Sequence, residues 1–192
     1  MRIKGDYRFM KRWMCALLAY MLLMGAAVGA LADREEDQAR LAVNLQAIKA
    51  ALDRNELTFT YREEGDSFFA EFDLSCAFPS CTVWLIAYDD GVQIEADYDV
   101  EADPARLDEL ALFLMRCNSS MRIGGFYIDY DERIVGYTTF IYSDVLPPTQ
   151  DALDFNMAIG LTMLERYGDQ VKAVLLDGMT AEDAWQAVTA EQ

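Results

Sequence analysis

Residues 116–142 read RCNSSMRIGGFYIDYDERIVGYTTFIY, and the rest of the chain is arranged around them. It begins as the last turn of a helix, breaks at Gly124-Gly125, and continues as two strands that fold back on each other at Asp131-Glu132. A helix must bury one apolar stripe and a hairpin one apolar face, so this unit needs a larger sheet to lie against. The residues before it supply strands, and the residues after it supply helices.

Alternation of apolar and polar residues predicts four strands before this stretch. Residues 57–61 and 68–74 form the first two, and residues 83–88 and 92–100 form a hairpin around Asp89-Asp90-Gly91. In the last of these strands the side chains of one face are apolar: Val92, Ile94, Ala96 and Tyr98. Those of the other face are polar: Gln93, Glu95, Asp97 and Asp99. We therefore expect a sheet with one buried and one largely solvated face.

Four helices are predicted around these strands. Residues 35–52 carry the apolar stripe of an amphipathic helix. A second helix begins at Pro104, is capped by Asp103, and carries Leu112 and Phe113 off its apolar stripe. A third, residues 151–167, is apolar nearly all round and is expected to kink at Gly168-Asp169, continue over 171–176 and stop at Gly178.

The fourth helix is short and begins with a capping box formed by Thr180 and Asp183. The complete order is therefore α-ββββ-α-ββ-α-α. This order predicts the α+β class, with an antiparallel sheet and helices packed on one of its faces.

The chain resembles the YbjN-like family of bacterial proteins over roughly residues 41–188. The resemblance rests on Arg116-Cys117-Asn118 at the end of the middle helix, Gly125-Phe126 opening a strand, and Leu176-Asp177-Gly178 before the segment MTAEDAW. It implies a fold similar to that of type III secretion chaperones. Family members are described as regulators or chaperone-like binding modules without a known catalytic activity, and the related chaperones act as dimers. The extra acidity and a secretion signal set this chain apart from that pattern.

The first 32 residues are typical of a secretory signal peptide. A basic start is followed by an apolar run from Trp13 to Val28 and by the cleavage signal Ala30-Leu31-Ala32. The run is about 16 residues, against the roughly 20 that span a bilayer as a helix. We expect cleavage after Ala32, with an uncleaved membrane anchor as the alternative. Either way, residues 33–192 form one domain delivered outside the cytoplasm, as a secreted or cell-envelope protein.

The net charge of the chain without its first 32 residues limits the kinds of molecule that it can bind. Removing residues 1–32 takes away five basic residues and one acidic residue, which leaves 11 Lys and Arg against 32 Asp and Glu, a net charge of −21. Such a surface repels nucleic acid and anionic lipid, so nucleic-acid binding is excluded, and membrane association requires the uncleaved anchor. Two interpretations remain: a basic partner or divalent cations, or a solubilising coat.

Composition also restricts the chemistry. The chain has no histidine, which excludes Ser-His and Cys-His nucleophile pairs and histidine metal sites. Cys76 and Cys81 flank one loop and are predicted to form a disulfide, with two free thiols as the alternative. Cys117 lies on an apolar stripe and is expected to be a buried, inert thiol.

The acidic residues give only weak indications of a calcium site or of a catalytic carboxylate pair. Residues 97–108 match a calcium loop at several positions, but Ala102 replaces its glycine and Asp108 its glutamate. Carboxylate pairs suited to glycoside hydrolysis arise by chance in so acidic a chain, so no pair is nominated. No metal site, cofactor or catalytic residue is predicted.

The functional prediction is a non-catalytic module that binds a protein or peptide, basic in character, and that forms a homodimer. Dimerisation is expected from the all-round apolar helix 151–167 and from Leu112 and Phe113. The predicted partner-binding face combines aromatic and acidic side chains of the sheet: Phe69, Asp73, Glu95, Asp97, Tyr127 and Asp129. The alternatives are an ordinary solvated face, a carboxylate-based secreted hydrolase, or a calcium-dependent structural protein.

Overall fold

The structure is a computed structural model that describes residues 34–143 and 146–190. The predicted signal segment, residues 1–32, lies outside the described residues. The chain divides into two compact units, residues 1–39 and residues 40–192. The described part of the first unit, residues 34–39, is helical, and helical structure in the second unit begins at Arg40 and runs to residue 54.

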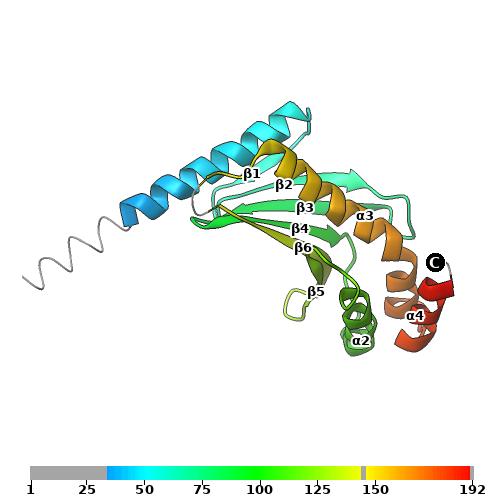
Figure 1. Cartoon of the computed structure of the whole chain (residues 1–192). Helices are drawn as coiled ribbons and strands as arrows, with labels where there is room; N and C mark the ends of the chain where they lie inside the picture. Colours follow the sequence, from blue (N-terminus) through cyan, green and yellow to red (C-terminus); the bar gives the residue numbers. More distant parts are fainter. Residues whose placement is uncertain (1–33, 144–145, 191–192) are drawn as a thin grey trace, which may run out of the picture. The chain divides into compact units, whose positions relative to one another are not determined.

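The second unit contains a six-stranded antiparallel sheet in the order β1-β2-β3-β4-β6-β5 (Figure 1). Its strands are β1 (Thr60–Arg62), β2 (Ser67–Asp73), β3 (Ser80–Ala87), β4 (Gly91–Tyr98), β5 (Gly125–Asp129) and β6 (Ile134–Tyr142). The β5–β6 hairpin joins the sheet through β6, which pairs with β4, so β5 becomes an edge strand. The predicted α+β class and antiparallel sheet are confirmed.

The helices follow the predicted order. A 3₁₀ turn, η1 (Pro104–Arg106), precedes α2 (Leu107–Asn118), and α3 (Gln150–Leu175) and α4 (Ala181–Ala190) end the described chain. Asp103 caps η1 by accepting a hydrogen bond from the Ala105 N–H at 3.0 Å. The N-cap half of the predicted capping box is confirmed, because the Thr180 hydroxyl accepts from the Asp183 N–H at 3.1 Å. The same hydroxyl donates to the Asp183 carboxylate at 2.7 Å.

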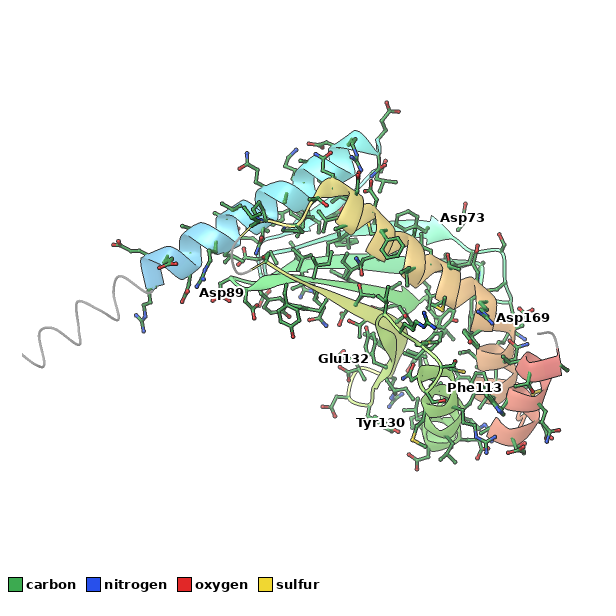
Figure 2. All side chains as sticks on the ribbon, viewed as in Figure 1. Asp73, Asp89, Phe113, Tyr130, Glu132 and Asp169 are labelled. Carbon is green, nitrogen blue, oxygen red and sulfur yellow. The ribbon has the colours of Figure 1, made fainter. Side chains whose placement is uncertain are left out.

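The predicted continuation of α3 past Gly168 is confirmed, since the helix runs without interruption to Leu175, and the kink at Gly168 stays a prediction. A Cβ at residue 168 would lie 2.4 Å from the Cys76 Sγ atom. The missing side chain therefore leaves room for the close approach of the 74–79 loop. Asp169, labelled in Figure 2, accepts a hydrogen bond at 2.7 Å from the Ala77 N–H of that loop.

The core lies between one face of the sheet and the helices. The central row across β3, β4, β6 and β5 pairs four buried residues: Val83, Ala96, Tyr137 and Phe126. Ala96 also lies against Gly160 of α3, where a Cβ would approach it to 3.2 Å. Residues 48, 51 and 52 of the first helix join the same core cluster. Among the described elements, the helices thus pack on one face, and the opposite face, called here the open face, carries none of them (Figure 1).

Only some of the apolar residues on which the predicted homodimer rests are exposed in the structure. Phe113, which lay off the predicted stripe, is fully buried and belongs to the core. Leu112 is 51% exposed, its neighbour Met115 is 64% exposed, and Phe155 of α3 is 54% exposed. Apolar side chains therefore remain on the helical surface, but fewer than the sequence pattern indicates.

Candidate functional site

Strand register brings acidic and aromatic side chains together on the open face. One row across the sheet pairs Thr82, Asp97, Gly136 and Tyr127. The next row pairs Phe69, Trp84, Glu95 and Thr138. Paired residues of antiparallel strands point to the same side of a sheet. Side chains from five strands therefore meet on one surface.

A cavity of about 530 Å³ opens between these rows. Its lining comes from β1 to β6 and the adjoining turns: Arg62, Glu64, Gly65, Ser67, Trp84, Ile86, Tyr88, Glu95, Asp97, Tyr127, Asp129 and Ile134. Four of the six predicted partner-binding residues, Glu95, Asp97, Tyr127 and Asp129, are among them. The volume falls in the range of small-ligand sites, about 300 to 1,000 Å³.

Asp97 is the most deeply placed acid of the cavity, with only 7% of its surface exposed. The Tyr127 hydroxyl donates a hydrogen bond of 2.5 Å to its Oδ1 atom. Loss of hydration raises the pKa of Asp97 to about 7, although the bond from Tyr127 acts in the opposite direction. The negative charges of Glu95 and Asp99 add to the rise. Asp97 therefore changes its charge near neutral pH.

Gly136 makes this contact geometrically possible. It lies between Asp97 and Tyr127 in the sheet row, and a Cβ at this position would approach the Asp97 Oδ1 atom to 2.1 Å and a Tyr127 ring carbon to 2.9 Å. Real Cβ atoms essentially never make contacts this short. The glycine thus leaves the space through which the two side chains meet.

Glu95 lies beside Asp97 on the open face and is half-buried. The Gln93 amide donates to its Oε1 atom at 2.7 Å, and the Tyr88 hydroxyl lies 3.2 Å from the Gln93 Oε1 atom. Burial raises the pKa of Glu95, while the bond from Gln93 lowers it by a smaller amount. A polar network from Tyr88 to Glu95 therefore fixes the second carboxylate.

The other three predicted residues differ in their roles. The Asp129 Oδ1 atom accepts hydrogen bonds from the N–H groups of Asp131 and Glu132 at 2.8 and 2.9 Å, so this carboxylate also fixes the hairpin turn. Phe69 does not line the cavity, but its ring packs on Trp84 at a centroid distance of 4.7 Å. Asp73 lies outside the cavity at the far end of β2, at the opposite end of the strands from Asp89 (Figure 2).

Sequence reasoning missed Trp84, Ile86 and Arg62 as lining residues. The run from Val83 to Tyr88 is apolar throughout, so it gave no alternation that would separate the two faces. The turn at Asp89-Asp90 could have identified the face on which Trp84 lies. Counting outward from it pairs Trp84 with Glu95, as the register shows, and this places Trp84 on the acidic face.

The cysteines lie away from this cavity. Cys76, Cys81 and Cys117 are free thiols in the structure, and a disulfide between Cys76 and Cys81 stays a prediction. Cys117 is buried as expected, and burial raises its pKa to about 12, which leaves it protonated and unreactive at neutral pH. Burial likewise raises the pKa of Cys81 to about 12.

The acids of the calcium-like motif do not converge. Asp97 contacts Tyr127, Asp99 accepts a hydrogen bond from the Thr82 hydroxyl at 2.9 Å, and Asp103 caps η1. Over the part of the chain that the structure describes, no three acidic or cysteine side chains gather as metal ligands would. Between residues 34 and 190, with 144–145 left out, no helix has the length and apolar character needed to cross a membrane.

Comparison with models of known protein families identifies the family of this chain. The model of the YbjN family, described as "Putative bacterial sensory transduction regulator", matches residues 44–173. The matched range includes every strand, α2 and most of α3, and therefore all the residues that line the cavity. No curated protein matches the chain significantly.

Proposed function

The chain belongs to the YbjN family of bacterial regulators, and on this premise we propose that its open face binds an extended, basic segment of another protein. The observation that carries the proposal is the placement of Glu95 and Asp97 beside Trp84 and Tyr127 in one cavity. Carboxylates recognise cationic side chains, and the aromatic rings supply apolar area and cation–π contacts. The proposed activity is binding without catalysis.

The balance of charge in the cavity supports a cationic ligand. Its described lining holds four acidic residues, Glu64, Glu95, Asp97 and Asp129, against the single basic residue Arg62. Asp97 is nine-tenths buried and receives its hydrogen bond from a neutral hydroxyl. A buried carboxylate is costly to ionise unless a cation accompanies it. An arriving lysine or arginine would supply that cation.

The shape of the surface supports an extended ligand. The open face is a twisted sheet whose rings line up along neighbouring strands: Phe69 on Trp84, and Tyr88, Phe140 and Tyr142 in sequence. Tyr142 is 77% exposed and Phe140 37% exposed. A segment with alternating basic and apolar side chains matches this distribution of acids and rings.

The binding test uses a nine-residue peptide that alternates lysine with valine, and a matched peptide in which glutamate replaces lysine. Fluorescence anisotropy measures affinity for the parent protein and for the variants Glu95→Gln, Asp97→Asn and Asp73→Asn. Removing one partner of a charge-assisted hydrogen bond costs about 1.5 to 3 kcal/mol, so we expect each cavity variant to bind at least about tenfold more weakly. Asp73→Asn is the matched control, because Asp73 lies on the same face outside the cavity. Equal weakening by all three variants would mean that only net charge matters and would contradict the proposal.

A carboxylate-based hydrolase is the second candidate, because the cavity holds an acid of raised pKa beside a second carboxylate. Glu95 and Asp97 are two residues apart on one strand, which places their Cα atoms about 6.6 Å apart. Carboxyl separations of about 5 to 9.5 Å serve glycoside hydrolysis. Reducing-sugar release from cell-wall and polysaccharide substrates tests this candidate. Activity that is lost in Glu95→Gln or Asp97→Asn would favour the hydrolase over the binding module.

The setting of the activity is also a proposal. The amino-terminal segment supports delivery outside the cytoplasm, with cleavage after Ala32. The intact mass of the protein recovered from its producing cells tests this directly. A mass that corresponds to residues 33–192 supports cleavage, and a full-length mass in the membrane fraction supports an anchor.

A further inference from the structure

A second cavity, of about 390 Å³, lies on the helical side of the sheet between α3 and the loop that joins α2 to β5. Its lining is Ser120, Met121, Arg122, Ile123, Tyr137, Ile159, Met163, Arg166 and Tyr167, and we call it the two-arginine pocket. Tyr137 pairs with Ala96 on the core side of the sheet, whereas the neighbouring Gly136 lies on the open face. The two-arginine pocket is therefore separated from the proposed peptide site by the sheet itself.

The loop that forms one wall is held by hydrogen bonds at both ends. The N–H groups of Ser120 and Met121 donate to the carbonyls of Cys117 and Asn118 at 3.2 and 3.1 Å. The Asn118 side chain exchanges two bonds with the Phe126 backbone, at 2.7 and 2.9 Å. The Tyr137 hydroxyl donates to the Ile123 carbonyl. A wall fixed in this way needs little reorganisation when a ligand binds.

Both arginines lack a carboxylate partner among the described residues. The protein has 33 acidic residues against 16 basic ones. Among the described residues Lys49, Arg54, Arg116, Arg133 and Lys172 form ion pairs, whereas Arg106 donates to the backbone carbonyls of Val174 and Met179. Arg166 instead lies 5.4 Å from the centroid of the Tyr167 ring, and no acidic residue lines the pocket. The pocket thus presents two available positive charges on a strongly negative protein.

The remaining lining is largely apolar. Met121, Ile159 and Met163 are half-buried and pack against the core. Methionine side chains are flexible and polarisable, so they adapt to apolar ligands of different shape. At the roughly 30 Å³ that one water molecule occupies in the liquid, the cavity holds about a dozen heavy atoms. It suits a small molecule better than a folded segment of protein.

We propose that the two-arginine pocket binds a small organic anion with an apolar body, of the medium-chain carboxylate class. The guanidinium groups of Arg122 and Arg166 would hold the carboxylate, and Met121, Ile159 and Met163 would contact the hydrocarbon chain. Arginine suits this role because its planar donor fork matches the two oxygens of a carboxylate. An inorganic anion would leave the apolar wall unused, and a cation or a neutral alcohol would leave the two charges unpaired.

The test uses sodium octanoate, with octanol and octylammonium as probes of equal chain length, on protein purified as it accumulates in its producing cell. Isothermal titration calorimetry measures affinity, and ¹³C-labelled methionine methyl groups locate the ligand by NMR. We expect saturable shifts at Met121 and Met163, little change at the exposed Met115 of α2, and weaker or absent binding of octanol and octylammonium. Similar affinities for octanoate and octanol would overturn the proposal, as would shifts centred on other methionines.

Arginine variants complete the test. Arg122→Gln and Arg166→Gln each remove one charge while keeping a long polar side chain, and both residues are exposed, so folding should persist. Each should weaken octanoate binding about tenfold, the usual cost of losing a charge-assisted hydrogen bond. Lys172→Gln is the control, because it removes one positive charge from α3 outside the pocket. Binding that is unchanged in both arginine variants, or equally weakened in Lys172→Gln, would refute the assignment.

Discussion

Replacing Asp97 with asparagine should make the protein more stable at alkaline pH and remove much of its pH dependence. The pKa of Asp97 is about 7 in the folded protein, against an ordinary value of 3.8. The folded state therefore holds this proton between about pH 4 and pH 7, whereas the unfolded chain releases it. The stabilising contribution is complete below pH 4 and is lost as the pH rises through 7. Asparagine has the same shape, stays neutral, and still accepts a bond from Tyr127.

The expected size follows from these two pKa values. Between pH 5 and pH 8, the free energy of unfolding of the parent should fall by about 2 to 3 kcal/mol through Asp97 alone. Screening by water reduces this little, because only 7% of Asp97 is exposed. Burial also raises the pKa of Glu95, so that residue contributes in the same direction in both proteins. The difference between parent and variant isolates Asp97.

Urea denaturation followed by circular dichroism at pH 5, 6, 7 and 8 measures this difference. The parent should lose stability relative to Asp97→Asn mainly between pH 5 and 7, and the difference should level off above pH 7. Asp73→Asn, an exposed aspartate on the same strand face, should follow the parent curve at every pH. Parallel curves for the parent and Asp97→Asn would refute the burial argument and place the pKa of Asp97 near its ordinary value.

Three further predictions concern peptide binding by Asp97, the packing of Gly136 beside it, and the proposed homodimer. Binding of the lysine peptide should weaken up to about tenfold from pH 8 to pH 6, because a cation favours the ionised form of Asp97; an affinity that is constant in anisotropy titrations would argue against contact with this carboxylate. Gly136→Ala should cost about 2 to 3 kcal/mol of stability in urea denaturation, because its Cβ would collide with Asp97 and with the Ala96 carbonyl at 2.7 Å, and a smaller loss would show that the strands relax. Light scattering at micromolar concentration should show a dimer that Met115→Glu dissociates, and a monomeric parent would disprove the proposed homodimer.

Local sequence patterns correctly predicted which side of β4 faces the core. Alternation along β4 separated Ile94 and Ala96 from Glu95 and Asp97, and the structure buries the first pair in the core and places the second on the open face. The alternation of apolar and polar residues and the residues that form turns and caps each involve only a few neighbouring positions. A single segment is therefore enough to predict these features. The same reasoning predicted the capping box at Thr180 and the order of the elements.

Contacts between segments that are distant in the sequence could not be predicted from local sequence patterns. The sequence does not show that β6 inserts between β4 and β5, yet this order brings Tyr127 to Asp97, 30 residues earlier in the chain. Gly168 illustrates the same limit, because the sequence does not show that its missing side chain makes room for Cys76 of a distant loop.

Local periodicity and composition were sufficient to predict the fold class, the inward and outward faces of β4, and the acidic character of its exposed residues. Tertiary structure alone decided which acids share a cavity, that Asp97 is buried deeply enough for its pKa to reach about 7, and that Arg122 and Arg166 line one pocket. Burial and proximity depend on strand order and helix packing. Those are set by the sum of many long-range contacts rather than by any one stretch of the chain.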